Sequence, residues 1–226
     1  MAPGLKPCFS EAWASLPRQI AWELLGNAAS SSLHAGETLF EFGAPCDGCY
    51  RLDEGLLKVS LHSLGGDEHI LNVLPPGSMV GTLDMIDGTS RSETVTAFVS
   101  SKLSFISRAR FEECAQHHPE IYHCLLRAFG QRLREAETDI AALTFLKAKG
   151  RVAHALLKIA KSLSGNSDNV TIPRAIHQKE LAALAGVARE NTNKILKGWE
   201  QSKILSKSSA TYRIHDKKRL QLETKS

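Results

Sequence analysis

The chain has 226 residues, which is enough for one large domain or two small ones with their own hydrophobic cores. Apolar residues make up 42% and charged residues 23%, values typical of a globular protein that exclude a disordered or collagen-like chain. The net charge of +4 is unevenly spread, because residues 1–146 hold 11 basic and 18 acidic side chains whereas residues 147–226 hold 17 and 6.

The basic last third indicates a polyanionic partner, with a solvated lysine-rich surface as the alternative. No apolar run approaches the roughly 20 residues of a membrane span, and residues 1–25 lack the basic and apolar regions of a signal peptide. The five cysteines are an odd number, which is typical of reduced thiols. We therefore expect a cytoplasmic protein with no membrane partner.

Residues 9–32 are predicted to form short helices, with a periodic stretch from Ile20 to Ala29. The pattern then changes to short β-type runs separated by Gly, Pro and Asp-Gly turn signals, among them Gly55. Short strands at about ten-residue spacing predict a small barrel or sandwich. The predicted runs are Thr38–Phe40, Leu56–Leu61, Ile70–Leu74, Thr94–Val99 and Leu103–Ile106.

A long helix is predicted after Pro119, because proline suits the first position of a helix. From Phe129 onward apolar residues recur at steps of four and three, which is the seam of a coiled coil over about two heptads. Arg132 and Glu137 flank that seam where a parallel two-stranded coil forms interchain ion pairs. This favours a parallel homodimer; an ordinary amphipathic core helix is the alternative. The apolar positions are Ile121, Leu125, Phe129, Leu133, Ala136, Ile140, Leu143 and Leu146.

The basic region begins with a second predicted helix over Val152–Leu163, a polar loop over 164–169 and a short strand over 170–173. Gln178–Ala185 predicts a short helix, Gly186-Val187 a tight turn, and the residues from Arg189 a further helix, which together give a helix-turn-helix. Two short runs that follow predict the strands of a wing, Ile204–Ser206 and Tyr212–Ile214.

One face of the helix from Arg189 carries Arg189, Glu190, Asn193 and Lys194, because spacings of one, four and five residues cluster on a helix. Arginine can donate twice to guanine, and glutamate can accept from the amino group of cytosine. Lys194 can reach a guanine or a phosphate. The alternative is a solvated face with a Glu190–Lys194 pair. The charge, the turn and the wing favour DNA recognition.

Several motifs make the sequence resemble the cyclic-AMP receptor/FNR (Crp-Fnr) family of bacterial transcription regulators, over about residues 30–220. No single motif is specific, but the set is. The matching pieces are Ala35–Phe40, Gly43, Tyr50, Gly55, Pro76-Gly77, Gly81, Arg91-Ser92, Phe145-Leu146, Gly150–Ala153, Gln178–Ala182, Gly186-Val187 and Arg189-Glu190.

The resemblance implies an α+β protein in three parts. These are a β-roll sensor of the double-stranded β-helix or jelly-roll type (1–118), a dimerisation helix (119–146) and a winged helix-turn-helix (147–226). It implies a homodimer on a pseudo-palindromic site in double-stranded DNA, a hinge near 148–150, and contact with RNA polymerase. The implied DNA-binding residues are Gln178, Arg189, Glu190, Asn193 and Lys194. At the third base-contacting position the family often has Arg; Lys194, which stands there, keeps the charge but lacks the bidentate fork of arginine.

The resemblance also implies a cyclic-nucleotide effector, cAMP or cGMP. A buried cyclic phosphate needs a fixed cation and hydrogen-bond donors, which Arg91, Ser92 and the backbone after Gly81 can supply; a surface salt bridge of Arg91 is the alternative. The implied effector-binding residues are Gly81, Thr82, Leu83, Arg91, Ser92, Arg132, Ala136 and Glu137.

This sequence departs from the family pattern at three places. Thr82 replaces the usual glutamate that contacts the ribose, which predicts about tenfold weaker binding. Glu93 replaces a small residue, and it opposes an anion if it faces the pocket but is harmless if it faces outward. Ala136 and Glu137 stand where cyclic-AMP receptors read adenine; Glu137 could instead accept from guanine or form the coiled-coil ion pair.

Other signals point to alternative functions. Cys46 and Cys49 form a CxxC that would suit a redox or metal sensor, but only Cys8 lies where the FNR branch carries its cysteine cluster. His117-His118 is expected in a helix-entry loop, and Cys114 and Cys124 as packing residues. No catalytic motif occurs, so we predict neither an enzyme nor a metal site. An effector-independent regulator and a nucleotide-binding module acting through a protein partner remain as further alternatives.

Overall fold

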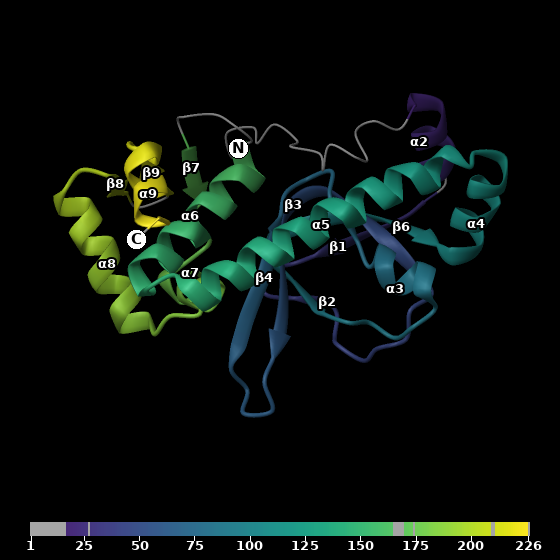
Figure 1. Ribbon diagram of the computed structural model, residues 1–226. Helices are drawn as coiled ribbons and strands as arrows, with labels where there is room; N and C mark the ends of the chain where they lie inside the picture. Colours follow the sequence, from purple (N-terminus) through teal and green to yellow (C-terminus); the bar gives the residue numbers. More distant parts are fainter. Residues whose placement is uncertain (1–16, 27, 165–169, 174, 209–210, 226) are drawn as a thin grey trace. The chain divides into compact units, whose positions relative to one another are not determined.

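The structure is a computed structural model that describes residues 17–26, 28–164, 170–173, 175–208 and 211–225 (Figure 1). Its contacts divide the chain into two compact units. The N-terminal unit contains the described residues of 17–61 and 74–134, and the C-terminal unit contains those of 62–73 and 135–225. The long helix α5 (Glu120–Phe145) contributes residues to both.

The N-terminal unit is built on antiparallel strands around β6 (Thr94–Ser107), which pairs with three others. These partners are β1 (Ala29–Leu33), β2 (Thr38–Phe40) and β3 (Gly48–His62), and β3 also pairs with β5 (Met79–Val80). Several apolar side chains of β3, including Leu52 and Val59, are buried in the core, although the register shifts of this strand interrupt a strict alternation. This confirms the predicted β-rich region. Strand β4 (Glu68–Leu74) belongs almost wholly to the C-terminal unit.

Two predicted interruptions lie inside long strands instead. β3 runs through Gly55, where its register with β6 shifts on either side of Glu54. Gly55 has a φ of +106°, and a Cβ there would lie 2.6 Å from the Cα of Ser101, so the site accepts only glycine. The glycine therefore makes a bulge in a continuous strand, and the two runs predicted over 94–106 are likewise one strand, β6.

The predicted helical stretch up to residue 32 is wrong in its last part. Helix α2 covers Arg18–Leu25, and Ala29–Leu33 form strand β1, paired with Ser101–Phe105. Alanine and serine carry little local preference, so pairing with the long strand β6 decides their conformation. The earlier residues of this prediction, 9–16, lie outside the described part of the chain.

A helix that the sequence analysis did not predict, α4 (Arg108–His117), follows β6 directly. Its N-terminus is capped by the Ser107 hydroxyl, which accepts from the backbone N–H of Arg110. His117 is therefore the last residue of a helix, and only His118 precedes Pro119 in a loop. Cys114 and Cys124 are buried in the cluster that α4 forms with α2 and the start of α5, which confirms their packing role.

The C-terminal unit contains the predicted helix-turn-helix. Helix α6 (Ala148–Ser164) packs against α7 (Gln178–Ala185) and α8 (Arg189–Gln201), as Figure 1 shows. A three-stranded antiparallel sheet in the order β7-β9-β8 and helix α9 (Lys217–Glu223) complete it. The strands are β7 (Val170–Pro173), β8 (Leu205–Lys207) and β9 (Thr211–Ile214), so the predicted wing strands are present. The predicted hinge residues 148–150 form the first turn of α6, and the break after α5 is at Leu146 and Lys147.

None of the described helices is long and apolar enough to cross a membrane.

Candidate effector site and nucleic-acid interface

Arg91 lies deep in the N-terminal unit, with 2% of its surface exposed. Its Nη1 donates to the carbonyl oxygen of Gly81 at 3.3 Å, and Nη2 donates to that of Gly48 at 2.8 Å. The guanidinium carbon lies 4.2 Å from the ring centroid of Phe40, a cation–π distance. The Nε atom is buried and has no hydrogen-bond partner. The structure thus rejects the surface salt bridge considered for Arg91 and places a fixed cation in the interior.

Gly81 makes this placement of Arg91 possible. Its φ is +72°, and a Cβ at this position would lie 2.2 Å from Nη1 of Arg91. Gly81 also precedes the short helix α3 (Thr82–Asp87). Thr82 is buried, whereas Leu83 is exposed.

The carboxylate of Asp84, a residue the sequence analysis did not single out, lies beside Arg91 and Ser92. Its Oδ1 accepts from the Ser92 hydroxyl at 2.7 Å and from the Ser92 backbone N–H at 3.3 Å. Its Oδ2 is 3.9 Å from Nη1 of Arg91, and both side chains are 2% exposed. Arg91 and Ser92 stand seven and eight positions after Asp84, and only the folding of α3 and the following turn brings them together, so no local pattern indicates this contact.

Glu93 is 7% exposed and pairs with Arg132 of α5, whose Nη2 lies 3.2 Å and 3.3 Å from the two carboxylate oxygens. The charge of Glu93 is therefore balanced by Arg132, and Arg132 reaches the site through Glu93. Ala136 and Glu137 are exposed and belong to the C-terminal unit, so their part in effector binding stays a prediction.

These residues fit the phosphate of a cyclic nucleotide in two respects and oppose it in one. A buried guanidinium with a free Nε–H and a neighbouring serine are the donors that such a phosphate requires. A nucleotide held there would be gripped by Arg91 and Ser92. However, the Asp84 carboxylate already accepts from Ser92, and its negative charge repels a phosphate.

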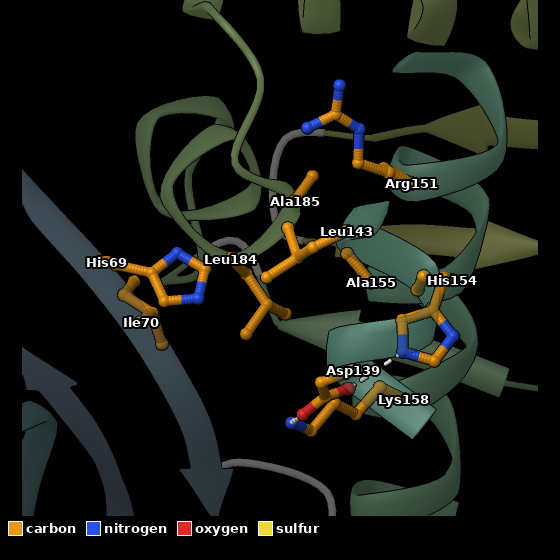
Figure 2. A pocket seen from close by; sticks show the side chains of 11 residues that line it. His69, Ile70, Asp139, Leu143, Arg151, His154, Ala155, Lys158, Leu184 and Ala185 are labelled. Carbon is orange, nitrogen blue, oxygen red and sulfur yellow. Dashed lines mark hydrogen bonds and ion pairs between the residues drawn. The ribbon is translucent and has the colours of Figure 1, made fainter. Parts of the chain in front are cut away.

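A pocket in the C-terminal unit contains a second charge cluster, which is half-buried (Figure 2). Asp139 of α5 accepts from Nε2 of His154 at 2.8 Å and pairs with Lys158, and the Lys158 ammonium also donates to the carbonyl oxygen of Leu71 at 2.6 Å. Burial alone would raise the pKa of Asp139, but the bonds from His154 and Lys158 outweigh it and hold the pKa below 3.8. The cluster joins the end of α5 to α6 and β4. The lining residues are His69, Ile70, Asp139, Ala142, Leu143, Arg151, His154, Ala155, Lys158, Leu184 and Ala185.

The turn between α7 and α8 has the conformation expected of a helix-turn-helix. Gly186 ends α7 with a φ of +59°, a left-handed conformation that side chains disfavour. Its carbonyl oxygen accepts from Nη1 of Arg151 at 3.3 Å, which ties the turn to α6. On α8, Thr192, Leu196 and Trp199 are buried.

The opposite side of α8 carries the predicted DNA-binding residues. Arg189, Glu190 and Lys194 are exposed, and Asn193 is half-exposed. The remaining predicted residue, Gln178, is half-exposed at the start of α7. The exposed basic side chains Lys207 and Arg213 lie on the wing strands. A helix with a free polar face, beside a basic wing, can enter a major groove while the wing meets the backbone.

The CxxC thiols do not have the environment of a reactive pair. Cys49 is fully buried, and this burial raises its pKa to about 12. Cys46 is half-buried, and its Sγ donates to the carbonyl oxygen of Gly48 at 3.6 Å. Among the described residues, no group of three or more His, Cys, Asp or Glu side chains is placed to hold a metal ion. Cys8 lies outside them.

Comparisons with known proteins identify both halves of the chain. Residues 31–118 match the cyclic nucleotide-binding domain, and residues 150–222 match the Crp-like helix-turn-helix domain. The CRP-like cAMP-activated global transcriptional regulator of Mycobacterium tuberculosis is 30% identical over 170 residues, which are 73% of this chain and 76% of that protein. The cyclic AMP receptor protein of Thermus thermophilus is 28% identical over 181 residues, 80% and 81% of the two chains.

Solved structures share the architecture. The Thermus thermophilus catabolite activator protein matches with a TM-score of 0.55 and 26% identity, over 95% of this chain and 98% of that one. FixK2 from Bradyrhizobium japonicum matches with a TM-score of 0.77 over 86% and 96% of the two chains, and at 20% identity this shows the fold alone. With both domains in the expected order, the chain belongs to the Crp-Fnr family of DNA-binding transcription regulators.

Proposed function

We propose that the protein is a homodimeric regulator whose sequence-specific binding to DNA is controlled by a cyclic nucleotide, cAMP or cGMP, in the N-terminal unit. The observation that carries the effector part is the buried Arg91 guanidinium, which has an unpartnered Nε in a domain of the cyclic nucleotide-binding family. A buried cation with a spare donor is costly unless an anion meets it.

The dimer is supported by an apolar stripe along α5. Leu126, Leu133 and Ile140 are 62–67% exposed and stand seven residues apart, at equivalent positions of successive heptads. Tyr122 and Leu143, also exposed, fall at the second apolar position of the same repeat. This stripe extends the predicted seam one heptad toward the N-terminus. A second copy of α5 is the partner whose spacing matches it.

The recognition of DNA follows from α8. In a dimer, two copies of α8 would enter successive major grooves about 34 Å apart on a pseudo-palindromic site. Arg189 would read guanine and Glu190 cytosine, with Asn193 and Lys194 beside them. Arg189→Ala should then relax base choice at one position at a cost of roughly 1–3 kcal/mol.

Control of DNA binding would pass along α5. In the N-terminal unit, Ser92 adjoins Glu93, and Glu93 is paired with Arg132 of α5. In the C-terminal unit, Asp139 of the same helix is bonded to His154 and Lys158 of α6. A phosphate that shifts Ser92 would thus act on a helix fixed to the DNA-binding domain at its other end. Contact with RNA polymerase stays a prediction.

Calorimetric titration of the dimer with cAMP and cGMP tests the effector assignment. We expect a dissociation constant in the range of roughly micromolar for one of them. Arg91→Ala should abolish both this binding and the effector response in DNA binding, whereas Arg127→Ala, at an exposed arginine of α5, should leave them unchanged. Unchanged nucleotide binding in the Arg91→Ala protein would refute the site.

An effector-independent regulator is the second candidate function. The observation that favours it is the Asp84 carboxylate, which already holds Ser92 and lies beside Arg91.

A further inference from the structure

Asp84 lies against the groups that a bound phosphate would use. The Ser92 hydroxyl and the Ser92 backbone N–H both donate to its Oδ1, and the Arg91 guanidinium faces its Oδ2 at 3.9 Å. A serine hydroxyl, a backbone N–H and a buried arginine are together the donor set of an anion site. In this protein the anion that meets them is a side chain of the protein itself.

Three features hold the Asp84 carboxylate and Arg91 beside each other. Asp84 lies on α3, the first helix turn after Gly81, and is 2% exposed. Gly81 also supplies the carbonyl oxygen that accepts from Nη1 of Arg91, so one short segment carries both partners of that nitrogen. The backbone of Arg91 is itself fixed, because its N–H donates to the carbonyl oxygen of Ala44 and its carbonyl oxygen accepts from the N–H of Gly43. Neither partner can move far from the other without breaking these bonds.

The other buried acid near the site, Glu93, has a different partner. Its carboxylate is paired with Arg132, whereas Arg91 lies beside Asp84. Each buried acid therefore has its own arginine, and a phosphate brought to Arg91 would add a second negative charge next to Asp84. Two anions cannot share the one guanidinium at low cost, so the phosphate and the carboxylate compete.

We propose that Asp84 is an internal counter-ion that occupies the anion position of Arg91 and Ser92, so that a nucleotide phosphate binds only by displacing it. The proposal rests on the proposed effector site and defines how that site is regulated. It makes Asp84 the residue that sets the effector concentration to which the protein responds. It also gives the unliganded protein an anion at the place where the effector would supply one.

The test compares cAMP and cGMP binding by calorimetry in the full-length wild type and the Asp84→Asn variant. Asparagine keeps the shape and can still accept from Ser92, but it removes the charge. We expect the dissociation constant to fall about tenfold or more in this variant, because a phosphate no longer meets a carboxylate. Asp87→Asn is the matched control, since Asp87 lies on the same helix but is exposed, and it should bind as the wild type does.

Thermal unfolding gives a second readout that does not depend on the nucleotide base. Inorganic phosphate should raise the melting temperature of the Asp84→Asn protein more than that of the wild type or the Asp87→Asn protein, because only the first has an unneutralised Arg91. If the Asn variant does not melt cooperatively, Asp84→Ser, whose hydroxyl can still accept from Ser92, replaces it in both experiments.

The outcomes separate this proposal from the proposed function. Nucleotide binding by the variant alone would support the internal counter-ion and refute nucleotide control of the wild type. Equal affinity in the wild type and the variant, with no difference in phosphate stabilisation, would refute the counter-ion and leave nucleotide control standing. If neither protein binds a nucleotide or is stabilised by phosphate, both the internal counter-ion and nucleotide control are refuted.

Discussion

Single residues distinguish an anion sensor from a thiol sensor on this scaffold. Arg91 is buried and keeps a free donor, whereas the Cys49 thiol is buried in an environment that stabilises its neutral form. Burial is the main cause of the high pKa of Cys49, and the nearby Arg91 charge lowers it only in part. A thiolate is the nucleophile in disulfide exchange, so this cysteine is poorly suited to a redox role.

Alkylation of the native protein checks this environment. With a pKa of about 12, only about one Cys49 thiol in ten thousand is ionised at pH 8. Iodoacetamide at pH 8 should therefore label the half-buried Cys46 and leave Cys49 unlabelled, as measured by mass spectrometry of the peptides. In urea both should be labelled at similar rates. Fast labelling of native Cys49, or a Cys46–Cys49 disulfide formed under mild oxidation, would contradict this interpretation and favour a redox sensor that uses the two thiols.

At the scale of elements, the stripe on α5 is the feature most closely tied to assembly. Leu126, Leu133 and Ile140 are exposed in one chain, although an isolated helix face of this kind is costly in water. By contrast, Ile121 and Leu125, which belong to the same run of apolar residues, are buried in the N-terminal unit. The helix therefore buries one apolar face in its own domain and leaves another exposed, which is the face that the proposed dimer would cover.

Adjacent substitutions on α5 test the dimer seam. Ile140→Glu places a charge at a seam position and should convert the dimer to a monomer by analytical ultracentrifugation, with at least about a tenfold increase in the dimer dissociation constant. Ala141→Glu adds the same charge one residue later, at an exposed position outside the seam, and should stay dimeric. A monomeric wild type, or equal effects of the two substitutions, would be inconsistent with the seam.

The sequence predicts elements well where local chemistry is strong and less well where distant contacts decide. Gln178–Ala185 and the turn at Gly186 agree with prediction because helix periodicity and a left-handed glycine are local signals. By contrast, Ala29–Leu33 form a strand and not the predicted helix, and Gly55 lies in a bulge and not in a turn between strands. Both outcomes depend on pairing with β6, whose residues lie far along the chain. The same limit applies to the candidate site. Arg91 and Ser92 were recognisable by their motif, but Asp84 was not, because its contact exists only once α3 has folded.

At the scale of the whole molecule, the charge division has a structural counterpart. The basic residues 147–226 contain all of α6, α7, α8 and the wing, and the residues predicted to read bases are exposed there. The acidic residues 1–146 contain the sheet around Arg91 and the α5 stripe. One part would therefore bind the polyanion, while the other would bind a small anion and the second subunit.

The central claim is that the protein binds DNA as a dimer and recognises a specific sequence. Selection of bound sequences from a pool of random double-stranded DNA tests this claim most directly. With cAMP, with cGMP and without either, the wild type should enrich a two-fold-symmetric site whose half-sites are centred about one helical turn apart. The Arg189→Ala protein should enrich the same site with relaxed choice at one symmetric pair of positions. Enrichment of a symmetric site would establish a dimeric, sequence-reading regulator, and the three conditions would show whether an effector is needed. Retention of DNA with no enriched sequence under any condition would contradict the account.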